Sequence, residues 1–392
     1  MLKYEIYDIG DEKMVSLNQN SNSCYLKRIK QLYSLYGFVK EEEAEGYILF
    51  SNNYGFFYNL ECIKLIANAK TDEEVEKKKN EYRDLGYQNI REHYFETLEK
   101  EEIILFQAYF QPERQKKILK NEYKKFKKYQ EKHLQIPYEY ITSDFQRENQ
   151  EIETNIIEYI LKNKKECQAQ LTILEAAAGY GKTCTVYEIL SKLLEQKKLQ
   201  VPILVELSKN RNARLFRYVL QDEIDKKFTM LSSKVVINEI KSGRLPLIID
   251  GFDELIEQKN KILDDADERS LSMLSTIADL LGEDSKAWVL LTTRNSAIFS
   301  GELFEEWIVQ KLGINCIVER LRIVKPSVKT WLGEDLYEIL GQQNINLEDI
   351  ANPVLLTFLK GMNKDKIAET FRNQESILKK YIELLFKRDN DR

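Results

Sequence analysis

Apolar and polar positions follow different patterns in different parts of the chain. From about residue 138 onward, short apolar runs alternate with stretches long enough for helices. Strands are expected at Leu171–Leu174, Pro202–Leu207, Leu247–Ile249 and Trp288–Thr292. This alternation is typical of a parallel sheet covered on both faces. After about residue 315 the strand pattern fades, so the rest is predicted to be all helical. Helices are expected there at Val328–Leu332, Leu336–Leu340, Pro353–Leu359 and Ser376–Phe386.

The N-terminal region predicts a separate unit of α/β or α+β class. Gly46–Tyr58 predicts two short strands around a turn at Ser51-Asn52-Asn53. Thr71-Asp72-Glu73-Glu74 has the pattern of a capping box, which would open a charged helix that ends near Gly86. Met1–Ile9 alternates like a strand and carries acidic residues early, unlike a secretory signal.

A basic helical stretch follows from Glu113 to Lys132 and contains eight lysines. Pro112 and Pro137 flank it, which favours a linker helix between domains. Tyr123, Phe126 and Tyr129 recur at a spacing of three, so one apolar stripe can pack against a neighbour. The lysines favour a solvated helix face over a contact with nucleic acid or a partner, although both interpretations stay open. The predicted domains are therefore residues 1–112, the linker 113–137, a nucleotide-binding domain at 138–314 and a helical subdomain at 315–392.

Composition narrows the class of protein. Of the 392 residues, 43% are hydrophobic and 31% are charged, which is typical of folded domains. No apolar run approaches the roughly 20 residues that span a bilayer, so no membrane is expected. The five cysteines are odd in number and form no CxxC pair, which favours reduced thiols in a cytoplasmic protein. A net charge of −5 gives no general attraction to nucleic acid.

The most informative chemistry follows the strand at Leu171–Leu174. The segment comprises Ala178, Gly179, Tyr180, Gly181, Lys182, Thr183 and Cys184, and a helix is expected to begin within it. Glycines let backbone N–H groups point at phosphates, lysine reaches the β- and γ-phosphates, and the threonine hydroxyl binds Mg²⁺. Ala176 stands where such loops usually have a first glycine, so a left-handed backbone there would cost energy. The segment predicts binding of a nucleoside triphosphate.

A second motif supports this interpretation. Leu247–Ile249 leads into Asp250-Gly251-Phe252-Asp253-Glu254, and Asp250 lies 68 residues after Lys182 (250 minus 182). An acid at the end of an apolar strand is suited to hold Mg²⁺, and Asp253 or Glu254 is suited to orient the attacking water. Together, the two motifs predict a P-loop NTPase.

The strand at Trp288–Thr292 ends at Arg294. If this strand lies beside the Asp250 strand, Arg294 faces the γ-phosphate and can respond to its presence. The alternative is a surface arginine that follows a strand.

These motifs resemble the NACHT class of STAND NTPases. Asp250–Glu254 is similar to the family's magnesium motif, Ala178–Thr183 to its phosphate loop, Val201–Leu207 to its second strand and Thr292–Arg294 to its sensor strand. Asn352–Leu356 resembles the motif in which a proline, here Pro353, packs against adenine. The resemblance covers about residues 138–392.

The resemblance implies an ATP/ADP-bound, Mg²⁺-dependent weak ATPase that acts as a switch, self-associates into an oligomer and engages an effector. Antiphage innate defence is the context it suggests. In the family, the segment resembling Ser376–Phe386 leads into a winged helix and a repeat sensor, whereas this sequence stops at Arg392. We therefore expect either a separate sensor or effector protein or a fragment of a longer chain. The alternatives are a cycling AAA+-like ATPase that acts on DNA or a partner protein, and a nucleotide-binding scaffold that scarcely hydrolyses.

The N-terminal domain cannot be assigned an activity from its residues. Glu61 and Lys64 suggest a nuclease, but their spacing differs from the usual Glu-x-Lys pair, and a helical i, i+3 ion pair is the preferred interpretation. The aromatic residues between Tyr47 and Tyr58 are expected in a core rather than on a base-stacking surface.

Overall fold

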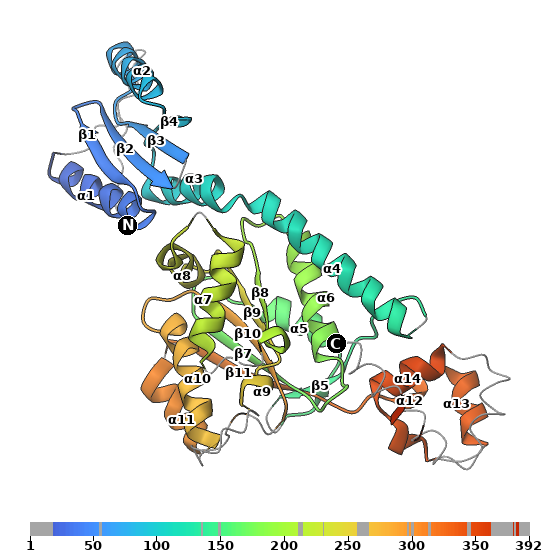
Figure 1. The fold of residues 1–392 in the computed structure, drawn as a ribbon. Coiled ribbons are helices and arrows are strands. Elements are labelled where there is room, and N and C mark those ends of the chain that lie inside the picture. The colour runs from blue at the N-terminus through green and yellow to red at the C-terminus, as the bar shows by residue number, and fades with distance from the viewer. Residues whose placement is uncertain are drawn as a thin grey trace, which may run out of the picture. The chain divides into compact units, whose positions relative to one another are not determined.

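The fold is described from a computed structural model of residues 1–392 (Figure 1). The described residues are 19–54, 57–134, 136–147, 150–210, 215–229, 231–256, 266–295, 298, 302–312, 315–342, 346–361, 379, 382 and 383. The chain divides into two compact units. The first comprises Met1–Pro112 with Ile224–Val236, and the second comprises Glu113–Glu223 with Ile237–Arg392. The predicted strand at Met1–Ile9 and most of Ser376–Phe386 lie outside the described residues.

The first unit is built on a four-stranded sheet of order β1-β2-β3-β4. Its elements are α1 (Gln19–Leu35), β1 (Val39–Glu43), β2 (Tyr47–Tyr54), β3 (Phe57–Lys64), α2 (Ala69–Asp84), β4 (Asn89–Tyr94) and α3 (Leu98–Phe110). β1, β2 and β3 are antiparallel neighbours, whereas β4 runs parallel to β3 because α2 crosses between them. The prediction of a mixed unit is confirmed.

Alternate positions of β2 and β3 pack against different helices. Leu49 and Cys62 form a core with Val75 of α2. On the other face, the ring of Phe50 stacks on Tyr33 of α1, with centroids 4.4 Å apart. Both faces of this sheet are therefore covered by helices, as Figure 1 shows.

Two local predictions in this unit were wrong. β2 continues through Ser51-Asn52-Asn53, and the connection to β3 falls at residues 55 and 56, outside the described residues. Asn52 can stay in the strand because its amide donates to the carbonyl of Tyr36, 3.1 Å away. The cap of α2 is Asn68, whose side chain accepts from the Thr71 amide; the predicted end of the helix near Gly86 is confirmed.

The second unit contains a seven-stranded sheet of order β6-β5-β11-β7-β10-β9-β8. Its strands are β5 (Phe145–Arg147), β6 (Ile152–Glu153), β7 (Gln170–Glu175), β8 (Ile203–Glu206), β9 (Leu247–Asp250), β10 (Trp288–Thr293) and β11 (Ile317–Ile323). β7 to β11 run parallel to one another, whereas β5 pairs antiparallel with both β11 and β6 at one edge of the sheet. Numbered by chain order, the parallel strands lie 5-1-4-3-2. All four predicted strands are present.

One helix precedes these strands and others connect them along the chain (Figure 1). They are α4 (Pro112–Leu134), α5 (Ile156–Asn163), α6 (Lys182–Glu195), α7 (Phe216–Lys227), α8 (Ser233–Lys241), α9 (Asp253–Ile256), α10 (Ala266–Leu281) and α11 (Glu302–Trp307). The basic stretch from Glu113 to Lys132 is helical as predicted, within α4. No helix among the described residues is long and apolar enough to cross a membrane.

The prediction that everything after residue 315 is helical was wrong. Ile317–Ile323 forms β11, which pairs with β7 on one side and β5 on the other. Charged residues interrupt the apolar pattern of β11 and concealed it, but Arg320 forms a buried ion pair with Glu175 of β7. A charge that is neutralised inside the fold thus looked like a solvent-exposed position in the sequence.

A small helical subdomain follows β11. It contains α12 (Val328–Leu332), α13 (Glu334–Gly341) and α14 (Pro353–Lys360), as the sequence predicted. Leu332, Leu340 and Leu356 belong to its shared core. α14 begins at Pro353, where a missing N–H costs nothing, and the Asn352 side chain accepts from the Val354 amide at 3.0 Å. This cap fixes Pro353 at the start of the helix.

Candidate nucleotide-binding site

The phosphate loop joins the carboxyl end of β7 to the N-terminus of α6. Gly179 and Gly181 both have φ = +82°, a backbone conformation that favours glycine. A Cβ at Gly179 would also lie 3.0 Å from the side-chain nitrogen Nδ2 of Asn352. Ala176 does not adopt a positive φ, and its N–H donates to the carbonyl of Thr293 at 3.2 Å. The strain expected at Ala176 is therefore absent, because the loop turns at the two glycines.

Lys182 is the first residue of α6 and folds back over the loop. Its Nζ donates to the carbonyl oxygens of Ala176 and Ala177, at 2.7 and 3.3 Å. Burial lowers the pKa of Lys182, and the nearby charges of Asp253 and Asp250 only partly oppose that shift. The ammonium group is thus held by carbonyl oxygens that phosphate oxygens can replace.

Asp250 ends β9 and is held by two hydroxyl groups. Thr183 Oγ1 donates to Asp250 Oδ2 at 2.7 Å, and Thr292 Oγ1 donates to Oδ1 at 2.6 Å. The Gly251 amide in turn donates to Thr292 Oγ1 at 2.9 Å. Burial raises the pKa of Asp250 even though both hydroxyls lower it. The strand order lets Asp250 meet both hydroxyls, because β10, which carries Thr292, lies between β9 and β7, and β7 leads to Thr183.

Thr292 was predicted only as part of a strand and of a family motif. Its position as the residue that orients Asp250 depends on the pairing of β10 with β9, which periodicity alone does not give. One feature of the sequence indicated this role. Thr292 places a hydroxyl inside an otherwise apolar strand, and a buried hydroxyl needs a hydrogen-bond partner.

Asp253 and Arg294 form an ion pair at the same edge of the sheet. Arg294 Nε lies 2.9 Å from Asp253 Oδ2. The other oxygen, Asp253 Oδ1, is buried and has no hydrogen-bond partner within the described part of the chain. Glu254, at the start of α9, borders the same cavity. Arg294 follows β10 and that strand lies beside β9, so the arrangement on which its predicted role depends is present.

The donor set fits a magnesium–nucleotide complex. Hydroxyl and carboxylate oxygens, the ligands that Mg²⁺ prefers, meet at Thr183 and Asp250. The unpartnered Asp253 Oδ1 adds an acceptor for a metal-bound or attacking water. Lys182 supplies the positive charge that phosphate groups need.

All of these residues border one cavity of about 1650 Å³. Ala178, Tyr180 and Cys184 line it on the loop side, and Pro353 lines it from α14. The cavity is large enough for a nucleotide, since small-molecule sites typically measure about 300–1,000 Å³. The structure therefore brings every predicted site residue to one place.

An aromatic wall of the cavity was not predicted. Tyr138 and Tyr140 precede β5 and line the cavity together with Trp331 of α12. Tyr140 Oη lies 3.0 Å from Thr185 Oγ1, and burial raises the pKa of Tyr140 to about 12. The run Ile136-Pro137-Tyr138-Glu139-Tyr140 was an indication in the sequence, because a proline followed by two tyrosines is unusual for a bare linker.

α4 is attached to α6, the helix that begins with Lys182. Tyr123 of α4 donates to Glu188 Oε1 of α6 at 2.7 Å, and Tyr138 donates to the same oxygen at 3.0 Å. The ring of Phe126 stacks on Tyr187, with centroids 4.0 Å apart and planes at 6°. The predicted apolar stripe of α4 thus packs directly on the phosphate-loop helix.

The first unit has a buried polar network of its own. Tyr33 donates to Glu101 Oε2 at 3.1 Å, and His93 Nε2 lies 2.9 Å from the same oxygen. Tyr109 donates to Glu61, and Arg91 Nε lies 3.7 Å from Glu61 Oε1. Among the described residues, no group of three or more His, Cys, Asp or Glu side chains is arranged to hold a metal. Glu101 is thus paired with Tyr33 and His93, whereas Glu61 Oε2 is buried without a hydrogen-bond partner among the described residues.

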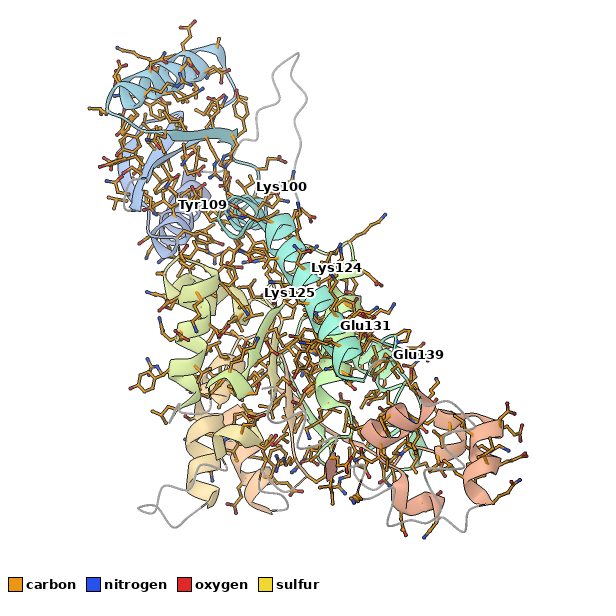
Figure 2. All side chains as sticks on the ribbon, turned by 45° about the vertical axis from the view of Figure 1, so that its right-hand side comes forward. Lys100, Tyr109, Lys124, Lys125, Glu131 and Glu139 are labelled. Atoms are coloured by element: carbon orange, nitrogen blue, oxygen red, sulfur yellow. The ribbon has the colours of Figure 1, made fainter. Side chains whose placement is uncertain are left out.

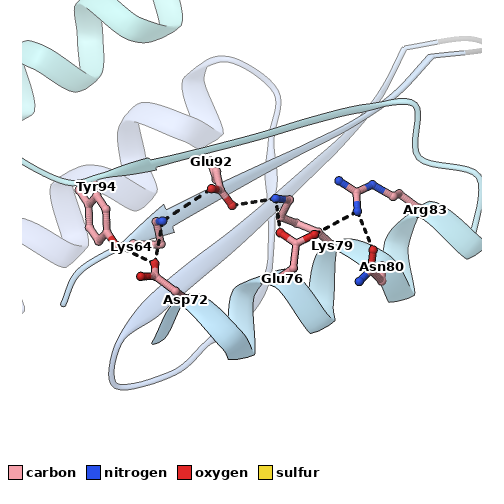
Figure 3. Close-up of polar contacts among 8 residues, drawn as sticks. All are labelled: Lys64, Asp72, Glu76, Lys79, Asn80, Arg83, Glu92 and Tyr94. Carbon is pink, nitrogen blue, oxygen red and sulfur yellow. Dashed lines mark hydrogen bonds and ion pairs between the residues drawn. The ribbon is translucent and has the colours of Figure 1, made fainter. Parts of the chain in front are cut away.

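The helical ion pair predicted for Glu61 and Lys64 was wrong. Both residues lie on β3, where Glu61 is buried and Lys64 pairs with Asp72 at 2.8 Å and Glu92 at 3.7 Å. Figure 3 shows these contacts as part of a chain of polar side chains that links β3, β4 and α2. The chain continues through Glu92 to Lys79, 2.9 Å apart. An i, i+3 spacing led to a helical interpretation of what is a strand.

Comparison with protein-family models agrees with this architecture. Residues 170–319 match the model of the NACHT domain. Residues 28–148 match the model described as NACHT-associated inactive Restriction Endonuclease 2. A search of curated proteins gave no match.

Proposed function

This chain is a NACHT-class P-loop NTPase, and we propose that it works as an ATP-binding, slowly hydrolysing signalling switch. The observation that carries the proposal is the meeting of Lys182, Thr183, Asp250, Asp253 and Arg294 at one cavity. The groups that P-loop chemistry uses thus meet at the carboxyl ends of the parallel strands of one unit.

Binding of the triphosphate exchanges hydrogen bonds that the loop makes with itself. Lys182 leaves the carbonyl oxygens of Ala176 and Ala177 for the β- and γ-phosphates. The backbone N–H groups from Gly179 to Gly181 donate hydrogen bonds to the phosphate oxygens at the N-terminus of α6. Lys182 therefore links phosphate binding to the conformation of the loop.

Thr183 and Asp250 would hold Mg²⁺, which neutralises charge on the β- and γ-phosphates. Thr292 keeps Asp250 oriented through its hydroxyl, 2.6 Å away. Asp253 and Glu254 orient the attacking water, with Asp253 Oδ1 as the acceptor that has no other partner among the described residues.

The Arg294–Asp253 ion pair is suited to sense the γ-phosphate. Arg294 Nε stays within 2.9 Å of Asp253 until a phosphate competes for it. A γ-phosphate draws the guanidinium away and leaves Asp253 free to hold water. Hydrolysis then restores the pair, so the two residues change partner with the state of the nucleotide.

The contacts between α4 and α6 can transmit a conformational change from the site to α4. A shift of α6 on phosphate binding is passed to α4 through Glu188 and through the stacked rings of Phe126 and Tyr187. Pro353 and Trp331 bring the helical subdomain to the same cavity, where Pro353 packs against the base. We propose that closure of this subdomain over ATP exposes surfaces for self-association.

The first unit is proposed to act as a non-cleaving module attached to the switch. The word "inactive" in the matched family description supports this, and so does the pairing of Glu61 and Lys64 with neighbouring side chains. A cytoplasmic role in antiphage innate defence, with a separate sensor or effector protein, is the context in which we place the switch.

The test is to identify the nucleotide that co-purifies with the chain and to compare ATP turnover with that of Lys182→Ala. We expect bound ADP, slow turnover, and a loss of ATP affinity of at least about 100-fold in the variant, because a phosphate cation is removed. Lys192→Ala, on the exposed part of α6, serves as the matched control. Unchanged affinity in Lys182→Ala would refute the assignment, and fast multiple turnover from an empty site would favour a cycling ATPase.

A further inference from the structure

The solvent side of α4 carries a regular row of lysines. Lys117, Lys120, Lys124, Lys128 and Lys132 recur at spacings of three or four, so they share one side of the helix. We call these five residues the lysine face; Figure 2 shows Lys124 on the ribbon of α4. At about 1.5 Å per residue the row is roughly 22 Å long.

The lysine face is not neutralised within the described part of the chain. None of its five members forms an ion pair there, whereas Lys116 and Lys127, on other sides of α4, are engaged. Lys116 Nζ donates to the carbonyl of Lys198 at 2.9 Å, and Lys127 lies over the rings of Tyr123 and Tyr138.

The acidic residues of α4 do not neutralise the lysines at the centre of the row. Glu113 and Glu131 lie at its two ends, where Glu113 is 3.7 Å from Lys116 and Glu131 accepts from the Tyr138 amide. Glu122 lines the cavity. In a chain of net charge −5, such a run of unpaired cations is a local positive field.

We propose that the lysine face binds the phosphate backbone of double-stranded nucleic acid without reading its sequence. Lysine contacts phosphate as a point charge, whereas base readout usually relies on the forked donors of arginine. A duplex presents roughly six phosphates per strand over about 22 Å. The row is therefore long enough to lie along several consecutive phosphates of a duplex.

Two observations disfavour other polyanions. Single-stranded binding surfaces interleave cations with stacking aromatics, but Tyr123 and Phe126 of α4 pack against α6 instead. A membrane-surface helix inserts a broad apolar face, whereas Leu119 and Phe126 of α4 are buried and Ile118 is a single exposed apolar side chain beside the lysines. A row of lysines with one exposed apolar residue and no exposed stacking ring in the described part of α4 favours a duplex contact.

The test measures duplex binding by the full chain with fluorescence anisotropy. Fluorescein-labelled duplexes of about 30 base pairs, one DNA and one RNA of the same sequence, are titrated between roughly 50 and 200 mM salt. In Lys120→Gln/Lys124→Gln/Lys128→Gln we expect at least about 10-fold weaker binding and a salt slope reduced by about 3. Tighter binding to one of the two duplexes would show whether the lysine face prefers the phosphates of DNA or those of RNA.

A matched control removes the same charge elsewhere. Lys192→Gln/Lys286→Gln/Lys329→Gln also lowers the net charge by three and is expected to leave duplex affinity unchanged. Lys182→Ala is expected to bind duplex normally, which separates this inference from the proposed ATPase function. Equal loss in both triple variants would show a net-charge effect and overturn the proposal.

Two other results would also overturn it. One is the absence of duplex binding at about 50 mM salt, where backbone contacts are strongest. The other is lysine-face-dependent binding to vesicles that contain phosphatidylserine, or to a single-stranded oligonucleotide, that is tighter than binding to either duplex.

Discussion

The two units of this chain each bury a carboxylate beside a sheet, but the side chains that contact the carboxylate differ between them. In the second unit, Asp250 accepts hydrogen bonds from the hydroxyls of Thr183 and Thr292 and borders a cavity of about 1650 Å³. These partners are small and neutral. They hold the carboxylate in place and leave its charge available to a ligand.

In the first unit, Glu101 is fully buried and meets the large side chains of Tyr33 and His93. Glu61 contacts Tyr109 and Arg91 through Oε1, while its Oε2 is buried without a hydrogen-bond partner among the described residues. Bulky partners thus satisfy Glu101 from within the fold. Burial of an acid is therefore not by itself an indication of chemistry; the partners decide whether the group can exchange ligands.

The largest effect is expected for Asp250→Asn. The amide keeps the shape of the side chain but removes the charge that Mg²⁺ needs, so the gain in ATP affinity from Mg²⁺ should fall by at least about 100-fold. Binding of a fluorescent ATP analogue, with Mg²⁺ and with EDTA, measures this. Global stability should not decrease, because a buried charge has been removed. A variant that keeps the full Mg²⁺ effect would show that Asp250 is structural, like the acids of the first unit.

The reverse pattern is expected for Glu101→Gln. The charged acceptor for Tyr33 and His93 is lost, which should destabilise the first unit by about 2 kcal/mol. Hydrogen exchange of peptides from β3 and α3 in the full chain measures the free energy of opening. ATP affinity should be unchanged. A loss of ATP affinity without a loss of protection would contradict the assignment of this network to stability.

The smallest effect concerns pH. Burial acts to lower the pKa of His93, but its hydrogen bond and charge interaction with Glu101 outweigh this and raise it. A raised histidine pKa stabilises the folded state fully below the unfolded pKa of about 6.5, and this stability is lost as the pH rises through the folded value. Protection of the first unit should therefore decline above about pH 6.5.

Neighbouring groups titrate as well, so a control is needed. Burial raises the pKa of Glu61, and both Glu61 and Arg91 act on His93 through their charges. The difference between the wild type and His93→Gln isolates the histidine contribution. An identical pH profile in the two proteins would rule out the pair as a source of pH dependence.

The sequence predicted most of the second unit because its patterns are local. The strands before Lys182 and at Asp250 are short apolar runs, and the phosphate loop needs glycines at fixed positions. What it could not predict is the order of the strands. The contact of Thr292 with Asp250 and the pair between Arg320 and Glu175 both arise from neighbours that are far apart in the chain.

The first unit was harder to predict for a physical reason. Its strands place polar residues inside, so Glu61 and Asn52 look solvent-exposed in the sequence although both are buried. The helix interpretation of Glu61 and Lys64 followed from their i, i+3 spacing, and the turn predicted at Ser51-Asn52-Asn53 followed from its turn-forming residues. Both segments are strands that hold buried polar residues. Side chains that satisfy one another across elements cannot be recognised from hydropathy alone.

The position of β7 between β10 and β11 has a consequence for synthesis of the chain. Gln170 pairs with Trp288 and with Ile317, so its second neighbour emerges from the ribosome about 150 residues later. At roughly 5–20 residues per second, this strand waits about 7–30 s for that neighbour. Until then, one edge of an apolar strand has no partner strand, and such unpaired edges make a nascent chain prone to aggregation.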